Sequence, residues 1–282
     1  MKYYTNKARQ AGMTLIELTV VLLVLVGLAG LMIPYVAGFV GKTHDATGSS
    51  NIQGLSTAII RYETEKGRYP NNMDSLINAS GDGIINYTMA DMMGSDAATE
   101  YGFSVLTITA NNTVQSAAAA VCGSLLKAGI ESTASMQDSS VANFNATFNN
   151  ASGERAMGMA MNNACMGTAK VIEVTEAAVE AALSRTLDGT NKKYIAFGVG
   201  QESELVGKTL TEAPVHFAKN ADMNASMAYN RFIAIFEVDA NADHTTKSAT
   251  RATYLGSVMA MSKLVGLQTE LGNYYADSAA NN

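Results

Sequence analysis

The stretch GMTLIELTVVLLVLVGLAGLMIPYVAGFVG, residues 12–41, decides the fold of this chain. Within it, residues 18–41 include no charged side chain. A helix of that length would rise about 36 Å, because each helical residue adds about 1.5 Å. The hydrocarbon core of a bilayer is roughly 30 Å thick. The sequence therefore predicts a membrane-spanning helix near the N-terminus.

One carboxylate, Glu17, lies at the edge of this apolar stretch. A charged group there is costly in lipid unless it finds a partner, so its position indicates a function. A secretory signal peptide is cleaved after its apolar region, whereas here the small-residue pair Ala11-Gly12 precedes that region. Cleavage after Gly12 would keep the apolar helix and expose an amine at Met13. In a neighbouring copy, that amine could act as the counter-charge of Glu17.

The junction at Gly12, followed by Met-Thr-Leu-Ile-Glu-Leu, resembles the class III prepilin signal. Type IV pilins and the pseudopilins of type II secretion share this signal. The resemblance implies that a prepilin peptidase cleaves between Gly12 and Met13 and methylates the amine of Met13. It also implies that Glu17 neutralises the amine of an adjacent subunit during assembly.

Three residues lower the helix propensity inside the apolar stretch, namely Gly27, Gly30 and Pro34. On their own they fit an ordinary membrane helix with a proline kink. The resemblance to type IV pilins implies instead that this part of the helix melts when subunits leave the bilayer.

Residues 42–66 are expected to form the second, amphipathic half of the same helix. Residues 42–50 are polar and contain Gly48, so the sequence predicts a weakened helix there. Beyond them, apolar residues recur at helical spacing at Ile52, Leu55, Ile59 and Tyr62. Arg61 and Glu65 form an i,i+4 pair on another face.

The sequence Gly67-Arg68-Tyr69-Pro70 is expected to end this helix. Glycine can cap a helix at its C-terminus and proline prevents its continuation. The same four residues resemble the junction between spine and head in major pseudopilins and in several pilins.

The remaining residues predict a head of mixed strands and helices. Strands are expected where β-branched and aromatic residues gather, at 101–109, 170–174, 194–199 and 231–238. Helices are expected at 113–130, 175–187 and 253–275. Asn112 and Gln115 form a possible capping box for the first of these helices. The strand at 231–238 is apolar on both faces, which favours a central position in its sheet.

Two cysteines, Cys122 and Cys165, lie well after the apolar stretch. In an exported head they would form a disulfide that closes a 44-residue loop, which stabilises by about 4 kcal/mol in the chain-entropy model. The alternative is two buried free thiols. The strand, the capped helix and the cysteine pair also resemble the head of type IVb major pilins, in which a disulfide bounds a variable surface region.

Asp239, Asn241 and Asp243 are spaced like the first ligands of a calcium loop. His244 stands where such a loop needs glycine, and Thr250 stands where it needs glutamate. A solvated turn is therefore favoured, and no metal site is predicted.

The chain lacks the sequence signatures of common enzymes: a Gly-x-Ser-x-Gly elbow, a phosphate loop, His-Glu-x-x-His and Cys-x-x-Cys. No enzymatic activity and no cofactor are expected. The formal net charge of −6 has the wrong sign for a protein that grips phosphates, so a nucleic-acid partner is also unexpected.

These observations predict an α+β, pilin-like chain with a long helical spine, half of it transmembrane, packed on an antiparallel-sheet head. Its expected parts are a leader (1–12), an apolar helix (13–41), an amphipathic helix (42–66), a head (67–189) and a C-terminal part (190–282). This last part either completes an enlarged sheet or forms an added lobe.

The resemblance implies a helical homo-oligomeric filament as the assembled state. Its partners would be a prepilin peptidase and a pilus assembly platform with its ATPase. The precursor would lie in the inner membrane and the filament outside the cell. The alternatives are a pseudopilin that drives protein export by type II secretion, and a minor pilin with an adhesive C-terminal lobe.

Overall fold

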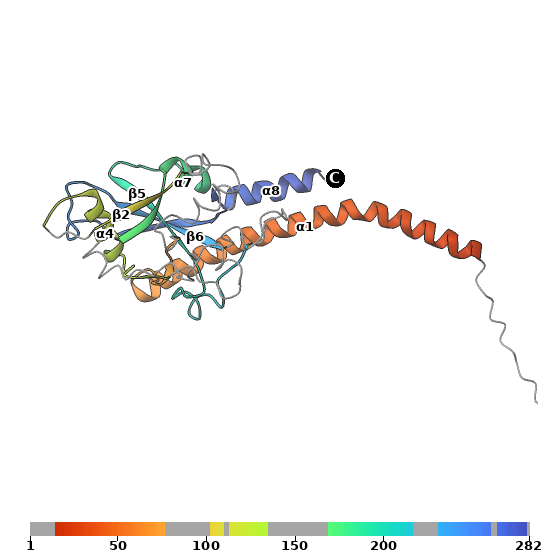
Figure 1. Ribbon diagram of the computed structural model, residues 1–282, viewed down its shortest axis with the longest axis horizontal. Coiled ribbons are helices and arrows are strands. Elements are labelled where there is room, and N and C mark those ends of the chain that lie inside the picture. Colours follow the sequence, from red (N-terminus) through yellow and green to blue (C-terminus); the bar gives the residue numbers. More distant parts are fainter. Residues whose placement is uncertain are drawn as a thin grey trace, which may run out of the picture.

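The computed structural model describes residues 15–76, 102–109, 113–134, 169–216, 231–260 and 264–280. A long helix, α1 (Leu15–Lys66), projects from a head that is built on one sheet (Figure 1). The N-terminal part of α1 extends away from the head, and its C-terminal part lies against the sheet. The expected α+β class is confirmed.

Helix α1 runs for 52 residues, and its helical assignment continues through Gly27, Gly30 and Pro34. The prediction of a weakened helix at residues 42–50 is wrong, because every residue there is helical. Helix α8 (Leu267–Ala280) packs against α1 and runs alongside its middle part (Figure 1). This packing supplies tertiary support that local propensity does not show. Melting of the helix during assembly stays a prediction.

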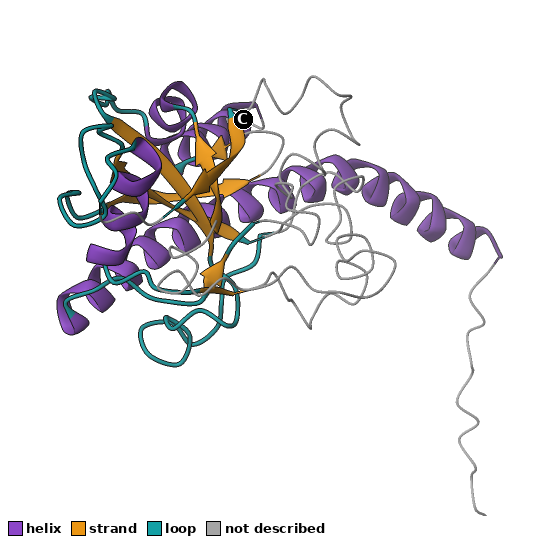
Figure 2. Cartoon of the chain, turned by 60° about the vertical axis from the view of Figure 1, so that its left-hand side comes forward, coloured by secondary structure: helices purple, strands orange, loops and turns teal. Residues whose placement is uncertain are grey.

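The described residues form one eight-stranded sheet (Figure 2). Its main path is β2-β4-β5-β6-β7-β8, and all neighbours on this path are antiparallel. The strands of this path are β2 (Phe103–Ile108), β4 (Ala169–Val174), β5 (Lys192–Gly198), β6 (Phe232–Asp239), β7 (Thr253–Ala260) and β8 (Leu264–Val265). The short β1 (Met73–Asp74) pairs antiparallel with β5 and parallel with β3 (Thr133–Ala134). All four predicted strands are present, and β5 to β8 join the same sheet as β2 and β4.

Strand β6 is central, as its two apolar faces predict, because it lies between β5 and β7. Phe232, Ala234, Phe236 and Val238 are buried in the core on one face of the sheet. Ile233 and Ile235 are buried in the core on the opposite face.

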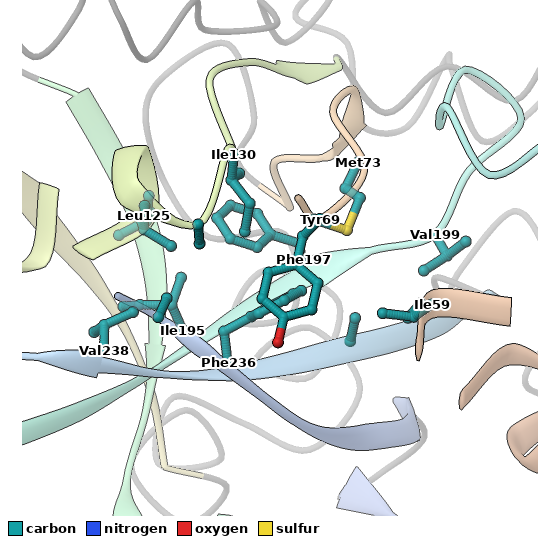
Figure 3. Close-up of a cluster of buried hydrophobic side chains, with 14 of the residues drawn as sticks. Ile59, Tyr69, Met73, Leu125, Ile130, Ile195, Phe197, Val199, Phe236 and Val238 are labelled. Atoms are coloured by element: carbon teal, nitrogen blue, oxygen red, sulfur yellow. The ribbon is translucent and has the colours of Figure 1, made fainter. Parts of the chain in front are cut away.

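The first core lies between the sheet and two helices, α1 and α4 (Ala117–Lys127). The predicted stripe of α1 is buried in it, at Ile52, Leu55, Ile59 and Tyr62. At its centre the ring of Phe236 packs against those of Tyr69 and Phe197, and Leu125 of α4 belongs to the same cluster (Figure 3). This burial of the α1 stripe fixes the spine to the head.

Helix α4 begins later than the sequence predicted. Its N-cap is Ser116, whose hydroxyl accepts a hydrogen bond from the backbone N–H of Ala119 at 3.1 Å. Gln115 therefore precedes the helix, and Asn112 lies outside the described residues. Serine and asparagine are about equally favourable as N-cap residues, so a helix that begins after Ser116 is capped as well as one that begins after Asn112.

The second core is covered by α7 (Glu176–Leu183), which buries Val179 and Ala182. This helix ends four residues earlier than expected, because Ser184 takes a left-handed conformation with φ of 51°. Nearby, the Glu180 carboxylate accepts a hydrogen bond from the backbone N–H of Leu187 at 2.7 Å. The chain thus turns back toward β5.

The predicted helix at 253–275 is wrong in its first half, which forms β7 and β8. Residues of β7 pair with β6 along its length, as in Ile233 with Val258 and Ile235 with Gly256. A side chain at position 256 would come within 2.9 Å of Leu183, so glycine lets α7 cross the strand here. Pairing with the central strand overrides the helical spacing of the apolar residues.

Candidate functional site

The N-terminal part of α1 is apolar and exposed on every side. The five consecutive residues from Leu22 to Val26 are each 51–75% exposed. Successive helical residues point about 100° apart, so these five cover the whole circumference of the helix. A helix that is apolar all round is stable only where other apolar groups cover it. This surface is therefore the strongest candidate for a functional contact.

By length and mean hydropathy, no helix within the described residues qualifies as a membrane span. The expected span over residues 18–41 is thus not confirmed.

Glu17 lies in the first turn of α1 and is exposed. A carboxylate at this end of a helix is favoured by the helix dipole. In the same turn, the Thr19 hydroxyl donates a hydrogen bond to the backbone carbonyl of Ile16 at 2.9 Å. Gly12 and Met13 lie outside the described residues, so cleavage, methylation and pairing with Glu17 stay predictions.

The junction between spine and head begins where the sequence placed it. Helix α1 ends at Lys66, and Gly67 has a φ of 70°. The backbone N–H of Gly67 donates to the carbonyl of Glu63 at 2.7 Å. Tyr69 then enters the core with its ring edge-on to Phe236, at 5.1 Å between centroids. The prediction that residues 67–70 end the helix is confirmed.

A second group of contacts, which sequence reasoning missed, centres on Glu204. Its carboxylate accepts hydrogen bonds from the Tyr62 hydroxyl at 2.7 Å and from the backbone N–H of Asn71 at 3.0 Å. Arg68 binds it with both terminal nitrogens, at 2.7 and 3.1 Å. The bonds from Arg68, Asn71 and Tyr62 outweigh burial and lower the pKa of Glu204 to about 2. No local pattern could have revealed a pair of residues 136 positions apart.

Glu204 makes the stability of the head sensitive to acid. Its pKa of about 2 in the folded chain lies below the ordinary 4.5, so its charged form stabilises the fold above pH 4.5. That contribution is lost as the pH falls from 4.5 toward 2. We expect Glu204→Gln to lower the free energy of unfolding by about 1.5–3 kcal/mol at pH 7. In urea unfolding at a series of pH values, the difference from wild type should shrink below pH 4.5. A difference that grows with acid would contradict this assignment.

Two of the three calcium candidates, Asp239 and Asn241, use their side-chain oxygens within the turn itself. Asp239 accepts hydrogen bonds from the backbone N–H of Asn241 at 2.9 Å and of Thr250 at 2.7 Å. Its second oxygen also lies 2.6 Å from Nδ1 of His244. The side chain of Asn241 accepts from the N–H of Asp243 at 2.9 Å. In the part of the chain that the structure describes, no group of three or more His, Cys, Asp or Glu residues could hold a metal ion.

Cys122 is fully buried on the inner face of α4 and is not a free thiol. Cys165 lies outside the described residues. The bridge between them therefore stays a prediction.

Comparison with known proteins adds one partial similarity. No family model matches the chain, and no solved structure matches it. The chain is similar to the type II secretion system core protein G of Aeromonas hydrophila, with 36% identity over 76 residues. The similarity covers 26% of this chain and 53% of that protein, so the chain spans about half the length of the relative it matches. It supports a relationship to the pilin and pseudopilin family, but gives no support to the type IVb subtype.

Proposed function

We propose that this chain is a structural subunit of a pilin-like filament and has no enzymatic role. The observation that carries the proposal is the all-round exposure of the apolar helix from Leu22 to Val26. An exposed surface of this kind needs either lipid or other protein helices around it. A filament subunit meets both needs in turn, because its helix lies in the inner membrane as a precursor and in the filament core after assembly.

The pairing of charges in the filament follows from the position of Glu17. Cleavage between Gly12 and Met13 by a prepilin peptidase would create a new amine a few residues before Glu17. The carboxylate of one subunit would then pair with the methylated amine of the next as the apolar helices bury one another. A pilus assembly platform and its ATPase would supply the work of extraction from the membrane.

The second candidate is a pseudopilin whose short periplasmic fibre drives protein export by type II secretion. The similarity to a type II secretion core protein favours it, as does the junction at residues 67–70. A third candidate is a minor pilin that displays part of residues 190–282 for adhesion. Extracellular filaments that contain this chain would support a pilin, whereas loss of protein export after its deletion would support a pseudopilin.

Maturation can be tested directly at the predicted cleavage site. We expect Gly12→Val to block cleavage, because the peptidase would need a small residue directly before Met13 and valine is too large. Intact mass spectrometry of membrane fractions should then show the full leader on every molecule, with no trace of the mature start.

The matched control is Gly54→Ala, a glycine of α1 with no atom within 4 Å of an added side chain. It should mature like wild type. A wild-type protein whose N-terminus lies beyond the apolar helix would rule out the filament proposal.

A further inference from the structure

Residues 199–210, called here the 199–210 loop, form a compact turn after β5. Leu205 is fully buried in the core that faces α1. Its carbonyl accepts hydrogen bonds from the backbone N–H groups of Lys208, Thr209 and Leu210 at 3.0–3.1 Å. The loop is thus closed by its own backbone and anchored in the core by Val199 and Leu205, with Leu210 packed against that core.

The same loop contacts the chain just after α1 through its backbone as well as its side chain. The N–H of Glu204 donates to the carbonyl of Asn71 at 3.0 Å, and the N–H of Asn71 donates to the Glu204 carboxylate at 3.0 Å. This reciprocal pair fixes the register of the two segments. Both hydrogen bonds depend on the loop staying in place.

Charges from both segments surround the ring of Tyr62, in the last turns of α1. The Arg68 guanidinium and the Lys208 ammonium lie 5.7 and 5.4 Å from the ring centroid. Glu204 is the acid that pairs with both cations, at 2.7 Å from Arg68 and 3.9 Å from Lys208. Without this carboxylate, the two cations would face the same ring and repel each other.

We infer that the 199–210 loop is a clasp that holds the C-terminal end of α1 on the head, with Glu204 as the residue that keeps it closed. Opening the clasp would free the last turns of α1 and the loop, removing Tyr62 and Leu205 from the edge of the first core and leaving the second core intact. Ile52, Leu55 and Ile59 lie closer to the N-terminus of α1 than Tyr62, and their core contacts do not involve Glu204. In a filament, force on the spine would reach the head through this junction, and that consequence rests on the proposed function.

Hydrogen exchange of the full chain in detergent tests the clasp without any filament. In Glu204→Gln, exchange should rise about tenfold or more in peptides covering 60–76 and 199–210, because charged hydrogen bonds are lost. In the wild type and in this variant, exchange in β6 and α4 should stay slower than in these peptides, because the clasp opens without global unfolding. Trypsin should also cut more quickly after Arg68, whose side chain is held by Glu204 in the wild type.

Two further variants make the result specific. Glu202→Gln removes an exposed acid from the same loop and should behave like wild type. Arg68→Lys keeps the charge but loses the two-pronged contact, so its exchange should rise less than in Glu204→Gln. Equal protection of the 60–76 and 199–210 peptides and of β4, β5 and β6 in the wild type would mean that the loop opens only when the whole head unfolds, and would overturn the clasp. Unchanged exchange in both Glu204→Gln and Arg68→Lys would overturn it too.

Discussion

Replacing Glu17 by alanine is expected to remove the subunit from filaments while leaving it processed and held in the membrane. The change would leave the Met13 amine of a neighbouring subunit buried without its counter-charge. Losing one partner of a buried ion pair costs about 3–5 kcal/mol. Incorporation should therefore fall more than about a hundredfold. The measurement is the ratio of this chain in sheared filaments to that in membranes, determined by immunoblot.

Glu65→Ala is the matched control for this experiment. Glu65 lies on the same helix, and its salt bridge at 2.7 Å with Arg61 is exposed. Such i,i+4 pairs contribute about 0.3–0.5 kcal/mol, so filaments of this variant should form normally. Normal filaments from Glu17→Ala as well would contradict the pairing of Glu17 with Met13.

The parts of the head that the sequence predicted well are those fixed by local burial patterns. Strand β6 alternates between two cores, and its sequence alone indicated both faces. The end of α1 was equally clear, because Gly67 and Pro70 restrict the backbone wherever they occur. Glu17 is also visible without a structure, as an acid beside an uncharged stretch, and its pairing with Met13 stays a prediction.

Other features depended on partners that are distant in the sequence. Residues 253–260 have apolar spacing that suits a helix, yet pairing with β6 makes them a strand. Residues 42–50 look weak as a helix, yet they lie beside α8. Glu204 gave no signal at all, because its partners Arg68 and Tyr62 lie 136 and 142 positions away in the sequence. Sequence reasoning therefore found the exposed apolar helix and missed the contacts of Glu204.

The largest loss of head stability is expected for Phe236→Ala. Phe236 is fully buried at the middle of the central strand (Figure 3). Its ring lies 5.1 Å from that of Tyr69, 5.9 Å from Phe197 and 5.6 Å from Tyr254. Removing a buried phenylalanine ring costs about 3–5 kcal/mol, and each ring pair adds to the loss. Because domains are stable by only about 5–15 kcal/mol, urea unfolding should show a much lower midpoint.

Phe39→Ala separates this effect from the loss of an aromatic ring in general. Phe39 is 64% exposed on α1, so its removal should leave the unfolding midpoint of the head unchanged. Tyr69 follows the end of the spine directly, so the cavity left by Phe236 would also loosen the junction beneath the clasp. Phe236→Ala should therefore raise exchange in β6 as well as in residues 60–76. A loss below about 1 kcal/mol would show that the aromatic cluster is not the main support of the head.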